Sequence, residues 1–206
     1  GGRAISVNAD VADEAQVKQL IESTISAFGT IDILVNNAGI MGPTAPAIKV
    51  ELADWERTLA VNVTGAFLCA KHALPLMMKQ GSGRILNITS VAGLGGYALR
   101  SPYSASKWAM IGLTRSLALE AGSYNITVNA IAPGPIKGDR INQVIRRRAE
   151  EMGREFAEVE REYVEPLALK RMAEEEDIAA MAVFLASEEG RHITGETLNI
   201  SSGYRV

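Results

Sequence analysis

Hydrophobic positions along the chain follow two alternating spacings, and each spacing predicts an element. Residues 14–28 carry apolar side chains three and four positions apart, which is typical of a helix that buries one face. Asp13 stands before this run as a candidate N-cap, and Gly29 follows it as a residue that tolerates the left-handed backbone at which many helices end. Residues 31–35 are instead almost continuously apolar, as in a strand of a sheet covered on both faces.

The same two spacings recur to the end of the chain. They predict further strands at residues 4–7, 84–88, 126–131 and 196–200, further helices at 55–79, 103–121 and 174–185, and a charged helical insert at 139–164. Strands that alternate with helices imply parallel βαβ units with right-handed crossovers. We therefore predict an α/β fold, a three-layer, Rossmann-like, doubly wound parallel sheet. No repeat or low-complexity linker divides the sequence, so residues 1–206 are expected to form one domain.

Length, charge and cysteine content narrow the class of function. The 206 residues suit one α/β domain, and the formal net charge of -3 argues against a nucleic-acid partner, whose binding surface would be strongly basic. Cys69 is the single cysteine, so neither a disulfide framework nor a thiolate zinc site is expected. No apolar run reaches the roughly 18 residues of a membrane helix, and the first residues lack a signal-peptide pattern. We therefore expect a cytoplasmic protein that acts on a small molecule and not on nucleic acid or a membrane.

Ligands of doubly wound sheets bind beyond the carboxyl ends of the strands, and several polar residues fit that region. Ser90 follows the strand predicted at 84–88. Tyr103 opens the next helix, and Lys107 lies four positions further on the same helix face. Asn62 lies in the helix predicted upstream. A Tyr-x-x-x-Lys pair alone is also typical of a surface helix with an exposed lysine, so the pair gains weight only from the motifs around it.

These residue types suit the transfer of a hydride to a carbonyl, which needs a proton donor at the developing alkoxide. A free tyrosine has a pKa of about 10, too high for efficient acid–base catalysis near neutrality. A neighbouring cation favours the phenolate form, and Lys107 is placed to act as that cation. Ser90 can hydrogen-bond the substrate oxygen, and Asn62 can hold a water that passes protons from Lys107 to solvent.

Further motifs accompany the pair in a fixed order. Residues 10–11 read Asp-Val after the first predicted strand, and residues 36–39 read Asn-Asn-Ala-Gly after an apolar strand. Residues 133–134 read Pro-Gly, and residues 193–200 contain the last predicted strand and the three residues before it. In this order and spacing the motifs resemble the short-chain dehydrogenase/reductase family, in its single-domain branch, and the likeness runs from residue 4 to residue 204. On its own, Asn-Asn-Ala-Gly is as typical of a simple turn.

The resemblance implies an NAD(P)-dependent oxidoreductase that interconverts an alcohol and a carbonyl, with a tyrosine as general acid and base. It implies that the catalytic residues are Asn62, Ser90, Tyr103 and Lys107. It also implies a cofactor site made of Asp10, Val11, Asn37, Ala38, Gly39, Tyr103, Lys107, Pro133, Gly134 and Ile136. In the family, the aspartate meets the adenine and the Ile136 backbone holds the nicotinamide carboxamide. The resemblance further implies that the cofactor is NAD or NADP, with NAD favoured, and that the helices at 55–79 and 103–121 pack across a two-fold axis into a homotetramer or homodimer.

The sequence departs from the family pattern at its beginning. The family opens with a strand, a glycine-rich turn that seats the pyrophosphate, and a second strand, about 50 residues by the size of two βα units. We therefore expect a longer natural polypeptide and, in this sequence, an unpaired edge at residues 4–7. The residue that sorts NAD from NADP belongs to the same opening segment. Lys137 and Gly138 replace a threonine that often contacts the cofactor amide, so the grip on the carboxamide is expected to rest on backbone alone.

Several interpretations stay open. The insert at 139–164 is where the family keeps a mobile lid. Its arginines are typical of a solvated helix face, although one turned inward would grip a carboxylate, phosphate or sulfonate. A non-catalytic, oligomerising remnant of the same fold, without the phosphate loop, would bind no nicotinamide cofactor. A related epimerase or dehydratase would share Tyr-x-x-x-Lys, but such relatives usually lack Asn-Asn-Ala-Gly. The motifs do not encode the substrate.

Overall fold

Four parallel strands form the sheet of the computed structural model, which describes residues 2–204. Their order across the sheet is β1-β2-β3-β4, the same as along the chain. The strands are β1 (Ile33–Asn36), β2 (Gly83–Ile88), β3 (Ile126–Pro133) and β4 (Thr197–Ile200). Ile85 of β2 stands in register with Leu34 of β1 and Val128 of β3. The predicted α/β class with a parallel sheet is confirmed.

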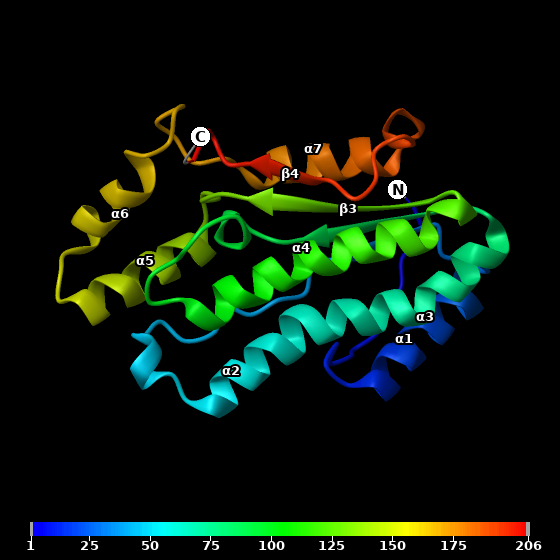
Figure 1. Ribbon diagram of the computed structural model, residues 1–206, viewed down its shortest axis with the longest axis horizontal. Coiled ribbons are helices and arrows are strands. Elements are labelled where there is room, and N and C mark those ends of the chain that lie inside the picture. Colours follow the sequence, from blue (N-terminus) through cyan, green and yellow to red (C-terminus); the bar gives the residue numbers. More distant parts are fainter. Residues whose placement is uncertain (1, 205–206) are drawn as a thin grey trace.

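Helices cover both faces of this sheet and one of its ends. They are α1 (Glu14–Phe28), α2 (Leu52–Leu59), α3 (Gly65–Gln80), α4 (Ser101–Ala121), α5 (Asp139–Met152), α6 (Phe156–Val164) and α7 (Glu175–Ala186). Figure 1 shows α1, α3 and α4 on one face and α7 on the other. The arrowheads of β3 and β4 point toward α5 and α6, so these two helices lie at the carboxyl end of the sheet (Figure 1).

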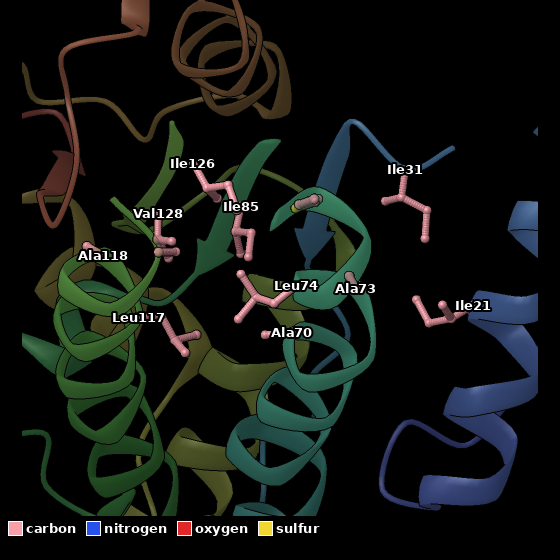
Figure 2. Close-up of a cluster of buried hydrophobic side chains, with 12 residues drawn as sticks. Ile21, Ile31, Ala70, Ala73, Leu74, Ile85, Leu117, Ala118, Ile126 and Val128 are labelled. Carbon is pink, nitrogen blue, oxygen red and sulfur yellow. The ribbon is translucent and has the colours of Figure 1, made fainter. Parts of the chain in front are cut away.

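The hydrophobic core has two layers, because successive side chains of a strand point to opposite faces. Ile85 is fully buried among Leu74 of α3 and Leu117 of α4, as Figure 2 shows. Its neighbour Leu86 packs instead with Ile131 and Leu185 on the α7 side. Each fully buried aliphatic side chain contributes about 1.5–3 kcal/mol to the stability of the fold.

A short polar network crosses the otherwise apolar layer between the sheet and α4. Asn36 Nδ2 donates to Asn87 Oδ1 at 2.8 Å, and Asn87 Nδ2 donates to Thr114 Oγ1 at 2.9 Å. All three side chains are buried, so the loss of one would leave its partners unsatisfied at a cost of about 1–3 kcal/mol. The network ties β1, β2 and α4 together where the 36–39 motif begins, and it thereby fixes the position of that motif.

The helix predicted at 55–79 is longer than expected and is interrupted. A single π turn, Ala60–Thr64, joins α2 to α3, and Pro75 lies inside α3. By length and composition alone, Leu52–Gln80 is apolar enough to cross a membrane, which the sequence reading did not anticipate. An 18-residue window of this stretch is 44% buried, and α3 packs against α1 and α4.

The other elements show where local pattern sufficed and where it did not. α1 has the predicted bounds, with Asp13 accepting hydrogen bonds from two helix N–H groups and Gly29 at a φ of 84°. The predicted strand at 4–7 is wrong, because no other strand lies alongside it among the described residues and a strand exists only through its ladder hydrogen bonds. The charged insert is two helices, since Gly153, at a φ of 61°, ends α5.

Candidate active site

A cavity of about 580 Å³ opens at the carboxyl ends of β2 and β3, between the sheet, α4 and the α5–α6 pair. Its wall includes most of the residues that the sequence singled out. These are Asn37, Gly39, Ser90, Tyr103, Lys107, Pro133, Gly134 and Ile136. Asp10, Val11, Ala38 and Asn62, which were also predicted, do not line it.

Tyr103 and Lys107 stand together on the first turns of α4. Lys107 is only 4% exposed, and its Nζ lies 5.6 Å from the centre of the Tyr103 ring. The ammonium donates to the Ile88 carbonyl at the end of β2, at 2.8 Å. Burial, and to a smaller extent the like charge of Arg140, lowers the pKa of Lys107 to about 8. The pair therefore presents a phenol and a titratable cation side by side at the cavity wall.

Ser90 reaches the same wall from the loop after β2. Its hydroxyl accepts a hydrogen bond from the Ala92 N–H at 3.2 Å and so begins the 3₁₀ turn Val91–Gly93. Gly93 lets this turn approach α4 closely, because a Cβ there would come within 2.6 Å of the Lys107 carbonyl oxygen. The Thr89 hydroxyl donates to the same carbonyl at 2.8 Å. These contacts place the serine loop against the turn of α4 that bears Lys107.

Asn62 lies behind the cavity wall, inside the π turn. Its Oδ1 accepts from the Ile40 N–H at 2.8 Å, and its Nδ2 donates to the Ile40 carbonyl and to Ser106 Oγ, both at 3.0 Å. A Cβ at Gly39 would come within 3.2 Å of Asn62 Oδ1, which favours glycine at that position. The side chain of Asn62 thus holds the end of the 36–39 motif against α4.

The wall chemistry suits the nicotinamide half of a dinucleotide. Lys107 has three N–H donors and uses one on Ile88, so it can hydrogen-bond ribose hydroxyls. Pro133 and Gly134 line the cavity at the end of β3. Ile136 forms an isolated bridge with Ala173, and the hydrogen bonds of this bridge come from Pro135 and Lys137. The N–H and carbonyl of Ile136 take no part in it and match the acceptor and donor of a carboxamide.

Asp10 and Val11 lie outside this cavity. Asp10 accepts from the Ala12 N–H at 3.0 Å and pairs with Arg57 at 3.0 Å. These two interactions hold the pKa of the Asp10 carboxyl below its usual value. Val11 packs against Gly65 and the cluster around Val17. The carboxylate expected at the adenine is therefore engaged by an arginine of α2.

Arg100, Tyr97 and Tyr163 are among the cavity residues that sequence reasoning missed. Arg100 precedes α4 and is 3% exposed, and Tyr97 and Tyr163 share a hydrogen bond at 2.6 Å between their hydroxyl oxygens. Arg100 occupies the N-cap position of α4, three residues before the helix start that the sequence predicted, so the sequence pattern did not mark it. The tyrosine pair joins residues 66 positions apart and carried no signal at all.

Known reductases and dehydrogenases resemble this chain in sequence and in structure. A family model described as enoyl-(acyl carrier protein) reductase matches residues 1–205. A 3-oxoacyl-[acyl-carrier-protein] reductase from Synechocystis sp. is 41% identical over 204 residues, which make up 98% of this chain and 76% of the relative. The structure of an NAD⁺-bound xylitol dehydrogenase superposes with a TM-score of 0.92 at 33% identity, covering 95% of this chain and 77% of that one. ElxO with NADP bound superposes with a TM-score of 0.83 at 33% identity, covering 95% and 75%.

Proposed function

The chain belongs to the short-chain dehydrogenase/reductase family, and from this premise we propose that it interconverts an alcohol and a carbonyl compound by hydride transfer, with Tyr103 as general acid and base. One observation carries the proposal: Tyr103, Lys107 and Ser90 come from two separate segments and line a single cavity at the carboxyl end of β2. A Tyr-x-x-x-Lys pair on a solvated helix would expose its lysine, whereas Lys107 is 4% exposed.

Each side chain has a role that its position supports. The Tyr103 hydroxyl donates a proton to the carbonyl oxygen as that oxygen becomes an alkoxide, and it takes the proton back in the reverse direction. The Lys107 ammonium stabilises the phenolate that remains. The Ser90 hydroxyl hydrogen-bonds the same substrate oxygen and orients it. Asn62 acts indirectly by holding the Gly39–Ile40 backbone in place.

A nicotinamide cofactor, when bound, supplies or accepts the hydride. We propose NAD or NADP, with NAD favoured. Lys107 would bind its ribose, the Ile136 backbone its carboxamide, and Pro133 and Gly134 one face of its ring. Relatives with NAD⁺ and with NADP bound both resemble this chain, which supports the class of cofactor and leaves the choice between the two open. We place the reaction, on a small-molecule substrate, in the cytoplasm.

The replacement Tyr103→Phe tests the proposal directly. It removes the transferable proton and keeps the ring, so we expect turnover to fall by about 10²- to 10⁴-fold. Turnover is followed at the nicotinamide absorbance band with a panel of alcohols and carbonyl compounds, on the full natural polypeptide. Cofactor binding, followed by fluorescence of NADH and NADPH, should survive.

Tyr124→Phe is the matched control, because Tyr124 is 44% exposed on a surface turn and should tolerate the same change. Retained turnover in Tyr103→Phe would refute the proton donor. A natural polypeptide that binds neither NADH nor NADPH would refute the enzyme and favour a non-catalytic member of the family.

A further inference from the structure

Arg100 places a buried positive charge in the cavity wall, directly before the helix that carries Tyr103. It is 3% exposed and lines the cavity. Its guanidinium carbon lies 5.0 Å from the centre of the Tyr103 ring and 5.6 Å from that of Tyr97. One Nη donates to the Met41 carbonyl at 2.8 Å, and Nε is buried without a hydrogen-bond partner. The charge thus meets two aromatic faces and one carbonyl, none of which bears a full negative charge.

Arg84 and Arg148 also have a buried Nε without a hydrogen-bond partner, but they differ from Arg100 in having a carboxylate nearby. Arg84 has the Glu188 carboxylate at 3.5 Å, and Arg148 has the Glu162 carboxylate at 4.0 Å. Within residues 2–204 no carboxylate lies within 4.0 Å of Arg100, and of these three arginines only Arg100 lines the cavity. A buried charge without a counter-ion is costly, and a ligand that brought the opposite charge would relieve that cost.

We propose that Arg100 binds a carboxylate of the substrate, so that the enzyme acts on short oxo acids and the corresponding hydroxy acids. This inference rests on the proposed function, since it uses the same cavity and the same tyrosine. A carboxylate accepts two parallel N–H bonds from the fork of a guanidinium, which would neutralise the charge of Arg100. Two such charge-assisted bonds also orient the rest of the substrate.

The distance from Arg100 to Tyr103 limits the length of that substrate. The phenol oxygen belongs to the ring whose centre lies 5.0 Å from the guanidinium carbon. A carbonyl on the phenol and a carboxylate on Arg100 are therefore only a few bonds apart. 2-Oxo, 3-oxo and 4-oxo acids span this range, and pyruvate, acetoacetate and levulinate are their simplest members.

Two exposed cations of the cavity are weaker candidates for the same role, and Lys107 is already assigned to the phenolate and the cofactor ribose. Lys137 and Arg140 line the wall but are exposed, so water and salt screen their charges. Asp139 and Glu175 stand on the same wall and offset them. Arg100 combines burial, the absence of a carboxylate partner among residues 2–204, and proximity to Tyr103.

Matched pairs of each oxo acid and its methyl ester test the assignment, because the ester keeps the carbonyl and loses the charge. In wild type we expect at least one acid to exceed its ester about 10-fold or more in kcat/KM. Arg100→Gln should raise KM for that acid by about 10- to 100-fold, the effect of one or two charge-assisted bonds, and leave KM for the ester within about 3-fold. Arg100→Lys keeps the positive charge but lacks the planar, two-donor geometry of the guanidinium, so its KM for the acid should lie between those of wild type and Arg100→Gln.

Arg146→Gln is the control for charge alone, since Arg146 is exposed on α5 and does not line the cavity. It should change neither KM. If Arg100 only supports the fold, Arg100→Gln will impair acid and ester alike, and that result overturns the proposal. A wild-type enzyme that reduces the esters and rejects all three acids overturns it as well, independently of any variant.

A binding measurement separates this inference from the proposed reaction. Pyruvate, acetoacetate and levulinate are each titrated calorimetrically into wild type and into Arg100→Gln, with and without cofactor. Binding that weakens about 10-fold or more in the variant supports the carboxylate site even if no carbonyl compound turns over, in which case the proposed reaction alone fails. Turnover of neutral ketones without any binding of the three oxo acids leaves the reaction standing and overturns the carboxylate site.

Discussion

At the scale of single residues, Lys107 lies in surroundings that favour its neutral form over its charged form. Its ammonium is buried in the cavity wall, and burial together with Arg140 lowers its pKa to about 8. Between about pH 8 and the ordinary lysine value of 10.5, an unfolded chain keeps this proton and the native chain has lost it. Stability linked to this group therefore rises with pH across that window. The ammonium that supports the phenolate is lost over the same window, so function and stability respond to pH in opposite directions.

This opposition gives a pH prediction. The kcat/KM for carbonyl reduction should fall as pH rises through about 8, because the free enzyme loses the Lys107 ammonium. Arg140→Gln should move that fall upward by roughly half a pH unit, since a partly screened like charge contributes under about 1 kcal/mol. The full pH profile of each enzyme is the measurement, with Arg146→Gln as the control that leaves it unmoved. Identical profiles for wild type and Arg140→Gln would contradict the role given to Arg140.

The sequence predicted the cavity residues whose placement is local. Tyr103 and Lys107 share a helix face by their spacing of four, and Ser90 follows a strand end. Arg100 and Tyr163 escaped prediction because their neighbours come from other segments, Met41 in one case and Tyr97 in the other. Asn62 was placed in the right region, but its bonds to the Ile40 backbone depend on how the 36–39 turn packs on α4.

At the scale of elements, α5 and α6 form a cover over the cavity that is tied to the loop before α4. Val144, Val159 and Tyr163 form an apolar cluster to which Tyr97 adds its ring. Burial, with a smaller effect from Tyr163, raises the pKa of the Tyr97 phenol, so its hydroxyl stays protonated well above neutrality. The hydrogen bond between the two tyrosines is therefore insensitive to pH near neutrality and ties α6 to the loop before α4.

Tyr163→Phe should loosen this cover. It leaves the buried Tyr97 hydroxyl without its partner, which costs about 1–3 kcal/mol. We expect faster amide hydrogen exchange in residues 156–164 and a Tm lower by about 2–4 °C for each kcal/mol lost. Replacing both tyrosines with phenylalanine should be milder than Tyr163→Phe alone, since no unsatisfied hydroxyl then remains. A double variant as unstable as the sum of the two single variants would show that the hydroxyl pair does not act as a unit.

The observed bounds of an element agree with the predicted ones where residues of that element or next to it determine its ends. α1 kept its predicted bounds because Asp13 and Gly29 terminate it locally. The interruption of the long α2–α3 stretch had no local cause in the pattern, because the π turn around Asn62 comes with that side chain's bonds to Ile40 and Ser106. Residues 4–7 have strand composition but no partner among the described residues, and strand composition alone does not make a ladder.

At the scale of the whole molecule, the domain leaves apolar side chains exposed on two opposite faces. On the outer side of α4, Trp108 and Leu119 are 52% and 87% exposed, and Phe67 on the neighbouring α3 is 44% exposed. On α7, across the sheet (Figure 1), Val183 and Phe184 are 70% and 41% exposed. Exposed apolar surface of this kind is typical of subunit interfaces. A dimer needs one such face, and a tetramer with two-fold axes needs two.

We therefore propose a homo-oligomer, with the α3–α4 face as its main contact. Leu119→Glu should place a charge in that contact and lower the oligomeric state, as measured by multi-angle light scattering. Val183→Glu distinguishes the two assemblies, because it should split a tetramer into dimers and leave a dimer formed through α4 intact. Leu169→Glu is the control, since Leu169 is 61% exposed outside both faces.

The same helix that carries Tyr103 and Lys107 carries Trp108 and Leu119, so dissociation should also lower turnover by loosening α4. A wild-type protein that is monomeric at micromolar concentration would contradict the assembly and leave the chemistry of the cavity untouched.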